Sequence, residues 1–277
     1  MKKRLILIAL ALVICISFAA CNTSSPSSQS QSTSGSESDF VDDGSDLSYV
    51  KNKGAMIIGY TVYEPMNFTD SDGNFTGFDT ELARIVCESL GVTPDFVEIN
   101  WDTKEVELEA KSIDCIWNGL TITDERKANM AITVPYVQNA QVVVMKADAE
   151  YTDTSSLADK TVCAEAGSAG ESTIMEDKDL MQSEYVAKDV QTACLMEVAA
   201  GTADAAVLDL TLANAMIGGG TDYANLEIKD RLAVENYGVA FRQDSDLCEE
   251  VNSIFQNLLI DGTMPGLAEK YGLDLAY

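Results

Sequence analysis

The stretch DCIWNGLTITDER, residues 114–126, shows the alternation that decides the fold class. Residues 113–117 are mostly apolar, which predicts a short buried strand. A turn follows, and the polar residues from Thr123 onward are typical of the start of a short helix. One strand followed closely by one helix is therefore the structural unit expected along the rest of the chain.

Strand-like and helix-like segments alternate on both sides of this stretch. We expect strands at residues 55–60, 94–99, 141–145, 161–165, 205–208 and 237–241. We expect helices at residues 79–90, 106–111, 191–200, 210–217 and 247–259, and another that begins at Ser168. Asp79 is suited to cap the first of these helices, and Ser168 with Glu171 forms a capping-box pattern. Such alternation predicts the α/β class.

The composition removes several classes of function. The chain of 277 residues carries 18 Lys+Arg, 45 Asp+Glu and no histidine, a formal charge of −27. Without imidazole it can form no Ser-His-Asp or Cys-His catalytic unit and no His-ligated zinc or iron site. A field this negative repels phosphate backbones, so we expect no nucleic-acid partner.

The first residues have the pattern of an export signal. Lys2, Lys3 and Arg4 precede an apolar run at residues 5–20, which is too short for an ordinary spanning helix. Two alanines and then Cys21 resemble a bacterial lipoprotein cleavage site, where the cysteine is diacylated, although Phe18 stands where Leu is usual. A plain secretory signal is the alternative. Cleavage after residue 20 would remove three cations and no acid, changing the charge from −27 to −30.

A polar segment follows the expected lipid anchor. Residues 22–38 are dominated by Ser, with Thr, Gln, Pro and Gly, a composition that cannot bury enough apolar surface to fold. We therefore expect residues 21–46 to tether a folded part to the outer face of a cell membrane. In a bacterium with two membranes the location would be the periplasm.

The remaining cysteines are odd in number and match no metal-ligand spacing. They are Cys87, Cys115, Cys163, Cys194 and Cys248. Each lies among apolar or helical residues, where cysteine usually acts as a small buried hydrophobic side chain. Export allows a disulfide, and Cys163 with Cys194 would be the first pair to consider.

Three motifs occur in a fixed order along the folded part. The first is GFDTEL at residues 77–82, after the aromatic-rich segment 60–68; the second is residues 114–126; the third is ADAAVLD at residues 203–209. Together they resemble the bacterial extracellular solute-binding proteins of family 3, which bind polar amino acids for ABC importers. The family pattern G-F-D-x-E-L-x-x-x-V matches residues 77–86. NGLTITDER, followed by VPY at residues 134–136, matches a second family pattern, and the resemblance spans about residues 48–272.

The resemblance implies a two-lobed, periplasmic-binding-protein-like fold of type II with two hinge strands. Lobe 1 would comprise residues 47–139 and 239–277, and lobe 2 residues 140–238. We expect a monomer without metal or cofactor.

The chemistry of an amino acid agrees with several residues of these motifs. A zwitterion requires a cation, an anion and neutral donors. Arg126 can grip a carboxylate with its planar fork, and Thr121 and the Gly119 amide would share that carboxylate. Ser168, at a helix N-terminus, adds a hydroxyl and backbone N–H groups. Asp209 ends a strand, where α/β sheets place ligands, and the resemblance implies that it holds the ammonium.

The resemblance also implies residues around the ligand side chain. Tyr63 and Trp101 match the aromatic walls of the family, and Asn118 can form a hydrogen bond from its strand end. Glu165 lies at a variable position that faces the side chain. Its carboxylate would favour cationic or amide side chains over acidic ones, although Tyr60 stands where binders of basic amino acids often carry an acid.

The sequence therefore predicts an extracellular, lipid-anchored receptor that delivers a polar amino acid to an ABC importer, and not an enzyme. A periplasmic-type dehydratase is the alternative, because the same fold hosts such enzymes. A sensor ectodomain is a third interpretation, disfavoured because no second hydrophobic segment occurs before Tyr277.

Overall fold

The computed structural model describes residues 43–277, so the expected signal segment, Cys21 and most of the expected tether lie outside the described residues. The strands are β1 (Ala55–Tyr60), β2 (Phe68–Thr69), β3 (Phe75–Thr76), β4 (Thr93–Glu98), β5 (Cys115–Thr121), β6 (Met130–Ile132), β7 (Val137–Lys146), β8 (Thr161–Glu165), β9 (Glu184–Lys188), β10 (Ala205–Asp209) and β11 (Leu226–Arg242). The helices are α1 (Asp46–Lys53), α2 (Phe78–Leu90), α3 (Lys104–Glu109), α4 (Asp124–Asn129), α5 (Ala169–Glu176), α6 (Gln191–Ala200), α7 (Leu210–Met216), α8 (Leu247–Ile260) and α9 (Thr263–Tyr271).

One mixed sheet organises the described residues. Its strand order is β4-β1-β5-β11-β7-β10-β8-β9, with β6 paired to β11, while β2 and β3 form a separate hairpin. β1 pairs in parallel with β4 and β5, and β8 pairs in parallel with β9 and β10. Parallel pairs joined through helices are typical of α/β proteins, so the predicted class is confirmed.

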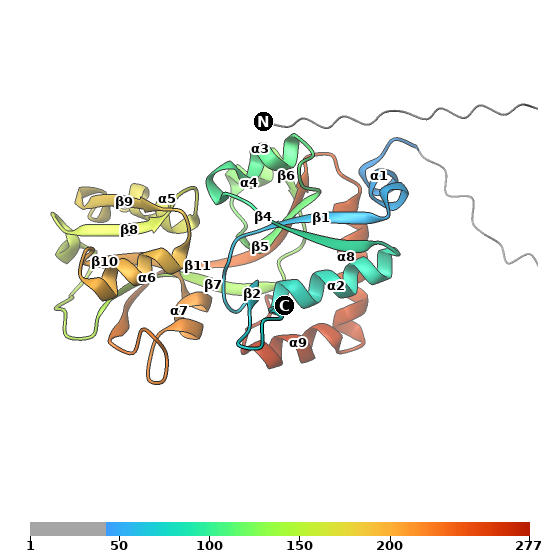
Figure 1. Ribbon diagram of the computed structural model, residues 1–277. Coiled ribbons are helices and arrows are strands. Elements are labelled where there is room, and N and C mark those ends of the chain that lie inside the picture. Colours follow the sequence, from blue (N-terminus) through green and yellow to red (C-terminus); the bar gives the residue numbers. More distant parts are fainter. Residues whose placement is uncertain (1–42) are drawn as a thin grey trace, which may run out of the picture. The chain divides into compact units, whose positions relative to one another are not determined.

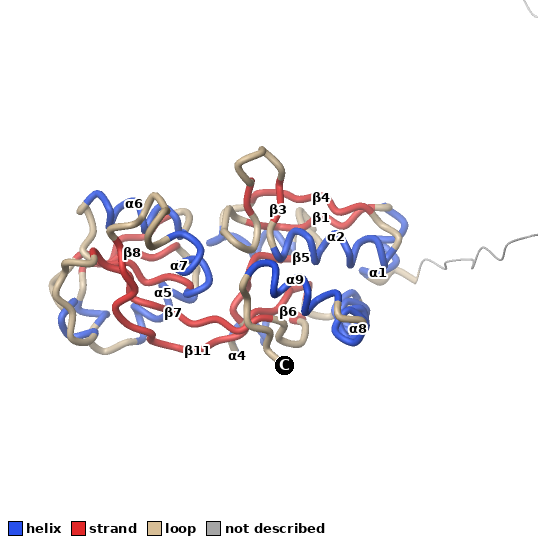
Figure 2. The backbone as a smooth tube through the Cα atoms, turned by 90° about the horizontal axis from the view of Figure 1, so that it is seen from below, coloured by secondary structure: helices blue, strands red, loops and turns tan. Residues whose placement is uncertain are grey.

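Two long strands connect the two ends of this sheet (Figure 1). β11 has 17 residues; its first part pairs with β7 and its last part pairs with β5 and β6. Figure 2 shows β7 and β11 running together from one group of helices to the other. We call the elements around β4, β1, β5 and β6 the first lobe, and those around β10, β8 and β9 the second lobe. The residue boundaries expected for the lobes fall inside β7 and β11 and stay a prediction.

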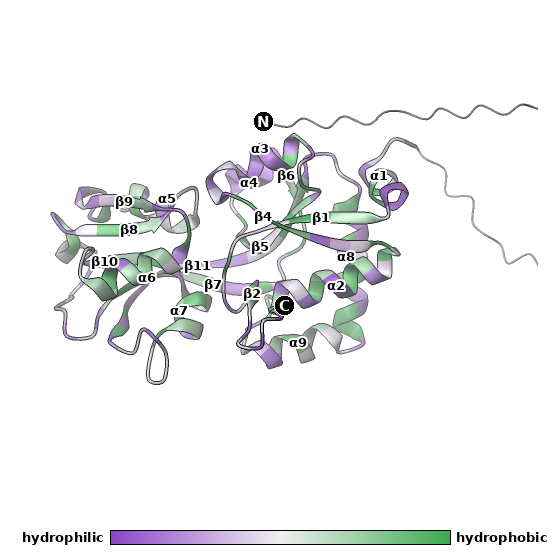
Figure 3. Ribbon diagram, in the orientation of Figure 1, coloured by the Kyte–Doolittle hydropathy of each residue, from purple (hydrophilic) through white to green (hydrophobic). Residues whose placement is uncertain are grey.

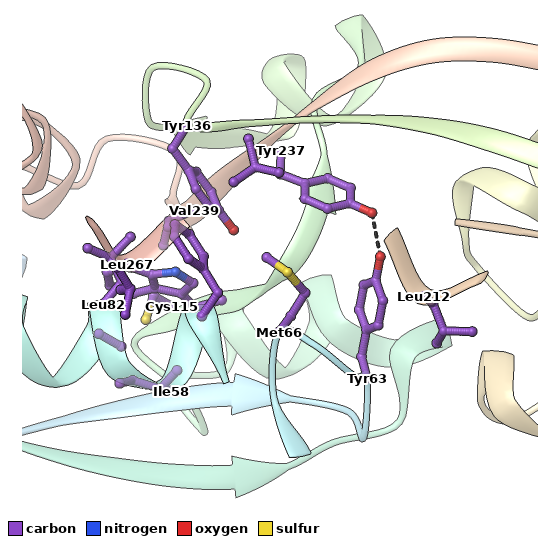
Figure 4. Packing of buried hydrophobic residues seen from close by; sticks show 14 of the residues in the cluster. Ile58, Tyr63, Met66, Leu82, Cys115, Tyr136, Leu212, Tyr237, Val239 and Leu267 are labelled. Carbon is purple, nitrogen blue, oxygen red and sulfur yellow. Dashed lines mark hydrogen bonds between the residues drawn. The ribbon is translucent and has the colours of Figure 1, made fainter. Parts of the chain in front are cut away.

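Apolar side chains cover both faces of the sheet. The largest cluster includes the rings of Trp117, Tyr136 and Phe255, which pack edge to face with centroids 5.7 and 5.8 Å apart. Figure 4 shows part of this cluster, including Ile58, Leu82 and Tyr136. Smaller clusters cover the opposite face in each lobe. In Figure 3 the inner strand β8 is largely hydrophobic, whereas α3 and α4 are largely hydrophilic.

Helix ends follow the sequence prediction in one case and not in another. The Ser168 side chain accepts a hydrogen bond from the Glu171 N–H, so this N-cap is confirmed. The prediction that Asp79 caps α2 is wrong: the N-cap is Gly77, and no side chain caps this end. The Asp79 carboxylate turns inward, because it accepts hydrogen bonds from strand β5 and from Tyr136.

The sequence analysis did not identify several elements. They are α1, β2, β3, β6, β9, α9 and the first two-thirds of β11. β9 and the start of β11 consist mostly of exposed and half-buried residues at the rim of the sheet, so they lack the apolar run that marked the inner strands.

The disulfide considered between Cys163 and Cys194 is absent. All five cysteines among residues 43–277 are free and buried, as expected for small apolar side chains. The Cys163 thiol is instead directed at the carbonyl oxygens of Ala205, at 3.4 Å, and Cys194, at 3.7 Å.

Candidate functional site

A small cavity lies between residues of the first and the second lobe. Its lining comprises Trp101, Asn118, Gly119, Thr121, Arg126, Glu165, Ser168, Ala169, Gln191 and Asp209. Its volume is about 10 Å³, roughly the space of a single water molecule. All of the residues that the sequence predicted for the site line this cavity, except Tyr63.

Strand ends bring these residues together. Glu165 and Asp209 are the last residues of β8 and β10, and residues 118–121 are the last of β5. The carboxyl ends of strands are where open α/β sheets place ligands, because the loops that follow diverge there. Residues almost a hundred positions apart therefore meet at one edge.

Arg126 supplies a buried cation. Thr123 caps α4, and this places Arg126 in the first turn, pointing back across the strand end. The residue is 8% exposed, and its guanidinium donates to the carbonyl oxygens of Thr121, at 2.8 Å, and Gly167, at 3.1 Å. Burial lowers its pKa, but a guanidinium keeps its charge in proteins. Both contacts are to neutral acceptors, so the fork remains suited to a carboxylate.

A network of amides holds Asp209 opposite this cation. Its Oδ1 accepts hydrogen bonds from Asn139 and Gln141, both at 2.6 Å, and its Oδ2 accepts one from Gln191. The same two amide groups of Asn139 and Gln141 also donate to Glu235, at 2.6 and 2.9 Å. Burial, together with the nearby charge of Asp209, raises the pKa of Glu235 to about 8. The donors thus fix the orientation of Asp209 before any ligand arrives.

Two acceptor atoms in the cavity have no hydrogen-bond partner among residues 43–277. They are Glu165 Oε1 and Asn118 Oδ1, and each residue is 3% exposed. The Asn118 amide N–H donates to Thr61 at 2.8 Å, which leaves its oxygen available. Burial, followed by the charge of Asp209, raises the pKa of Glu165 to about 8. Buried polar atoms without partners are costly, so both oxygens are suited to a donor supplied from outside.

The Gly119 amide is not available in the way that the sequence suggested. Its N–H donates to Asp79 Oδ2 at 2.7 Å, and the other oxygen of Asp79 accepts from Tyr136 at 2.8 Å. Burial raises the pKa of Asp79 to about 7. Thr121 is likewise occupied, since its hydroxyl donates to Glu235 at 3.0 Å.

Tyr63 lies behind the cavity wall. Its hydroxyl contacts Thr211 and lies 2.5 Å from the Tyr237 hydroxyl, a pair that Figure 4 shows. Gly119 has φ +60°, and a Cβ there would lie 2.8 Å from the Tyr63 ring. The tyrosine therefore packs against the backbone that lines the cavity, without itself reaching it. Trp101, by contrast, lines the cavity from a short 3-10 helix.

A wider cavity of about 650 Å³ shares Thr121, Arg126 and Ala169 with the small one. Lys104 and Gly167 also line it. Among residues 43–277 there is no cluster of acidic or cysteine side chains suited to a metal ion. In this part of the chain, no helix combines the length and the apolar character that a membrane span requires.

Sequence reasoning missed five polar residues of this region. They are Lys104, Asn139, Gln141, Gln191 and Glu235. None belongs to the motifs that stood out in the sequence. A polar residue inside the apolar strand run at 141–145 was the one available signal, because a buried amide needs partners.

The chain is similar to known proteins along most of its length. The family model of bacterial extracellular solute-binding proteins, family 3, matches residues 56–274. The chain belongs to this family. The L-cystine-binding protein TcyJ of Escherichia coli (strain K12) is 29% identical over 252 residues, which cover 87% of this chain and 91% of that protein.

Solved structures of similar proteins have the same two-lobed fold. A mutant of ArgBP from T. maritima has a TM-score of 0.75 and 32% identity, covering 82% of this chain and 98% of its own. The ancestral amino acid-binding protein AncCDT-1, a precursor of cyclohexadienyl dehydratase, has a TM-score of 0.74 and 29% identity, covering 82% and 99%. The periplasmic-binding-protein-like fold expected from the motifs is thus confirmed.

Proposed function

We propose that this family member is a lipid-anchored extracellular receptor that binds a polar amino acid between its lobes and delivers it to an ABC importer. The observation that carries the proposal is the placement of a buried guanidinium and a buried carboxylate across one cavity, with a different lobe supplying each. This arrangement suits the two charges of an α-amino acid. The names of similar proteins, which refer to cystine and arginine, support the same class of ligand.

In this proposal Arg126 binds the ligand carboxylate and Asp209 binds the ammonium. The ligand carboxylate replaces the carbonyl oxygens as the hydrogen-bond acceptor of the Arg126 guanidinium. The two hydrogen bonds to the carboxylate are bidentate and stronger than those they replace. Ser168 and the first N–H groups of α5 lie beside it and favour negative charge. Because the two partners lie on different lobes, a bound ligand stabilises the closed form.

The unpartnered oxygens of Glu165 and Asn118 suggest what kind of side chain is bound. Both atoms accept hydrogen bonds, so they favour a side chain that carries N–H donors, cationic or amide. An acidic side chain carries no N–H group for these two oxygens, and its carboxylate would lie beside the carboxyl group of Glu165. Trp101 supplies a flat apolar wall, as the family resemblance implies.

The small cavity is far below the size of an amino acid, so the lobes must separate to admit one. The adjoining wider cavity offers a path to Arg126 from solvent. Opening, entry and closure would then follow in sequence, as in other hinge proteins that close around ligands.

Titration calorimetry with arginine, lysine, glutamine, cystine and glutamate tests the ligand class. We expect arginine, lysine or an amide-bearing or cystine-like ligand to bind, and glutamate to bind most weakly. Tightest binding of glutamate would contradict the side-chain assignment.

Replacing Arg126 tests the carboxylate assignment. Arg126→Met keeps an apolar stem but removes the fork, and we expect affinity to fall at least about 100-fold, since a charge-assisted bidentate contact is lost in a buried site. Lys127→Met, which removes an exposed cation from the same helix, is the matched control. Equal affinities in both variants would contradict the role of Arg126.

Lipid attachment is tested separately. Metabolic labelling with a fatty acid should mark the wild-type protein, and Cys21→Ala should release an unlabelled protein into the medium. Labelling that persists in this variant would place the lipid elsewhere.

A dehydratase is the second candidate function, because AncCDT-1 is a precursor of such an enzyme. A buried Glu165 with raised pKa has the protonation state of a general acid near neutral pH. Mass spectrometry of candidate amino acids incubated with the protein distinguishes the two: unchanged ligand supports the receptor, and loss of water supports the enzyme.

A further inference from the structure

Lys104 is a buried cation that the proposed binding of ligand does not use. It is the first residue of α3 in the first lobe, directly after the short 3-10 helix of Trp101. Its side chain is buried, with 4% exposure for the whole residue. A lysine is seldom this buried unless its charge has a specific task or partner.

The Lys104 ammonium reaches across the space between the lobes. Its Nζ donates to the carbonyl oxygen of Trp101 at 3.1 Å and to that of Gly167, in the second lobe, at 2.9 Å. It also lies 5.0 Å from the centre of the Trp101 ring, within the range of a cation–π contact.

The Gly167 carbonyl oxygen also accepts a hydrogen bond from a second cationic side chain. The Arg126 guanidinium donates to it at 3.1 Å, also from the first lobe. We call these two contacts, from Lys104 and Arg126 to the Gly167 carbonyl, the Gly167 latch. Hydrogen bonds from charged donors are stronger than neutral ones, so one carbonyl that accepts two of them is firmly held.

The backbone around Gly167 is shaped for this approach. Its φ is +69°, and a Cβ there would lie 2.9 Å from the Asp102 Cα and 3.3 Å from the Lys104 Nζ. Glycine therefore lets the two lobes come into direct contact at this point. Its N–H donates to Glu171 at 2.7 Å, which fixes the direction of the carbonyl.

The Lys104 part of the latch lies next to the cavity without lining it, whereas Arg126 belongs to both. Gly167 stands between Glu165 and Ser168, which both line the cavity, whereas Lys104 lines only the wider one. Holding Gly167 therefore also holds the loop that carries these two residues against the first lobe.

We propose that Lys104 is a positioning residue that stabilises the closed arrangement of the lobes through the Gly167 latch, without contacting the ligand. When a ligand carboxylate takes the Arg126 fork, Lys104 keeps its half of the latch. Ligand enters the open form but is held by the closed one. Because apparent affinity then scales with the fraction of ligand-free protein that is closed, the latch strengthens binding of every ligand by a similar factor. Its kinetic effect is on ligand release, since release requires opening.

The test compares Lys104→Met, Lys104→Arg and the exposed control Lys127→Met. Fluorescence energy transfer between labels on the two lobes reports the closed-to-open ratio without ligand. We expect that ratio to fall about tenfold in Lys104→Met, because one charged hydrogen bond between the lobes is lost. The ratio should be largely restored in Lys104→Arg and should stay unchanged in the control. An unchanged ratio in Lys104→Met would overturn the proposal.

Ligand kinetics give an independent readout. The part of the inference that concerns ligand rests on the proposed function; the distance measurement does not. For the two tightest-binding amino acids of the panel, the dissociation rate constant koff should rise about tenfold in Lys104→Met, by the same factor for both ligands. The association rate constant kon should change little. A change in the order of ligand preference would instead make Lys104 a ligand contact and overturn the latch.

A measurement on the wild-type protein guards against a variant that does not fold. Lys104 should be acetylated by an amine reagent at least tenfold more slowly than Lys127, and faster when the lobes are opened by mild denaturant. Equal rates for the two lysines would also overturn the proposal. If no amino acid binds but the distance shift occurs, the latch stands and the proposed function fails.

Discussion

At the scale of single residues, the site is defined by titratable groups that are buried without full compensation. Glu165 shows this most clearly, because one of its oxygens has no partner and its pKa is raised to about 8. Lys104 is its counterpart among the cations, since burial lowers the lysine pKa to about 8. Groups perturbed in this way sense the charge of a ligand more strongly than exposed groups do.

Glu165 should make the binding of a cationic ligand depend on pH. Below about pH 8 its carboxyl group is protonated in the free protein, and a cationic side chain requires the ionised form. Binding then releases a proton, so affinity for arginine should rise up to about tenfold per pH unit between pH 6 and 8 and level off above. Calorimetry at several pH values measures this slope.

Lys104 and Glu235 also titrate near pH 8, so a variant is needed to isolate the contribution of Glu165 to the pH dependence. Glu165→Gln removes that contribution alone. The slope for arginine should become flatter in this variant, while glutamine, a neutral ligand, should show little slope in either protein. The same slope in both proteins would assign the proton to another group.

At the scale of elements, one glycine explains much of the GFDTEL motif. Gly77 has φ +126°, and a Cβ there would lie 2.1 Å from the Met66 carbonyl oxygen. The N–H groups of Asp79 and Thr80 both donate to this same oxygen. The start of α2 is therefore fastened to the preceding loop, which places Asp79 where its carboxylate meets strand β5.

Gly77→Ala should destabilise the protein strongly. Both the backbone conformation and the lack of space oppose a methyl group, so we expect a loss of more than about 3 kcal/mol in the free energy of unfolding. Urea denaturation measures it. Gly266→Ala is the matched control, since that glycine lies within α9 with open space around it, and there alanine should stabilise by about 0.5–1 kcal/mol.

At the scale of the whole molecule, the two lobes share strands β7 and β11 but divide the binding partners. The residues assigned to the ligand carboxylate and ammonium come from opposite sides of one cavity. A ligand therefore contributes to stability only through the closed form, and closure and affinity are linked.

Ligand should accordingly raise the stability of the native protein. At a concentration of 100 times Kd, the free energy of unfolding should rise by about 2.7 kcal/mol. Chemical denaturation with and without ligand measures this gain. Arg126→Met should show almost no gain at the same concentration, and a full gain there would mean that the ligand is bound without this cation.

The sequence predicted the inner elements and the motif residues well, for local physical reasons. β1, β8 and α6 have the bounds expected from their apolar patterns, and the cavity lining includes the motif residues Asn118, Arg126 and Asp209. Apolar runs and helix caps depend on neighbours in the chain, which the sequence displays directly.

The residues that it missed depend on distant partners. Asn139, Gln141 and Glu235 meet Asp209 because β7 pairs with both β10 and β11. The Gly119 N–H, which the motif suggested would bind a ligand, donates a hydrogen bond to Asp79, 40 positions away. No local pattern specifies such pairs.

The sequence by itself determined the α/β class, the family and the charged residues that suit an amino acid, because these follow from composition, periodicity and motif order. The tertiary structure decided which groups are left without partners and which bridge the lobes. Lys104 is the clearest example: its position at the start of α3 is local, but its role depends on a carbonyl 63 positions away that only chain folding brings to 2.9 Å.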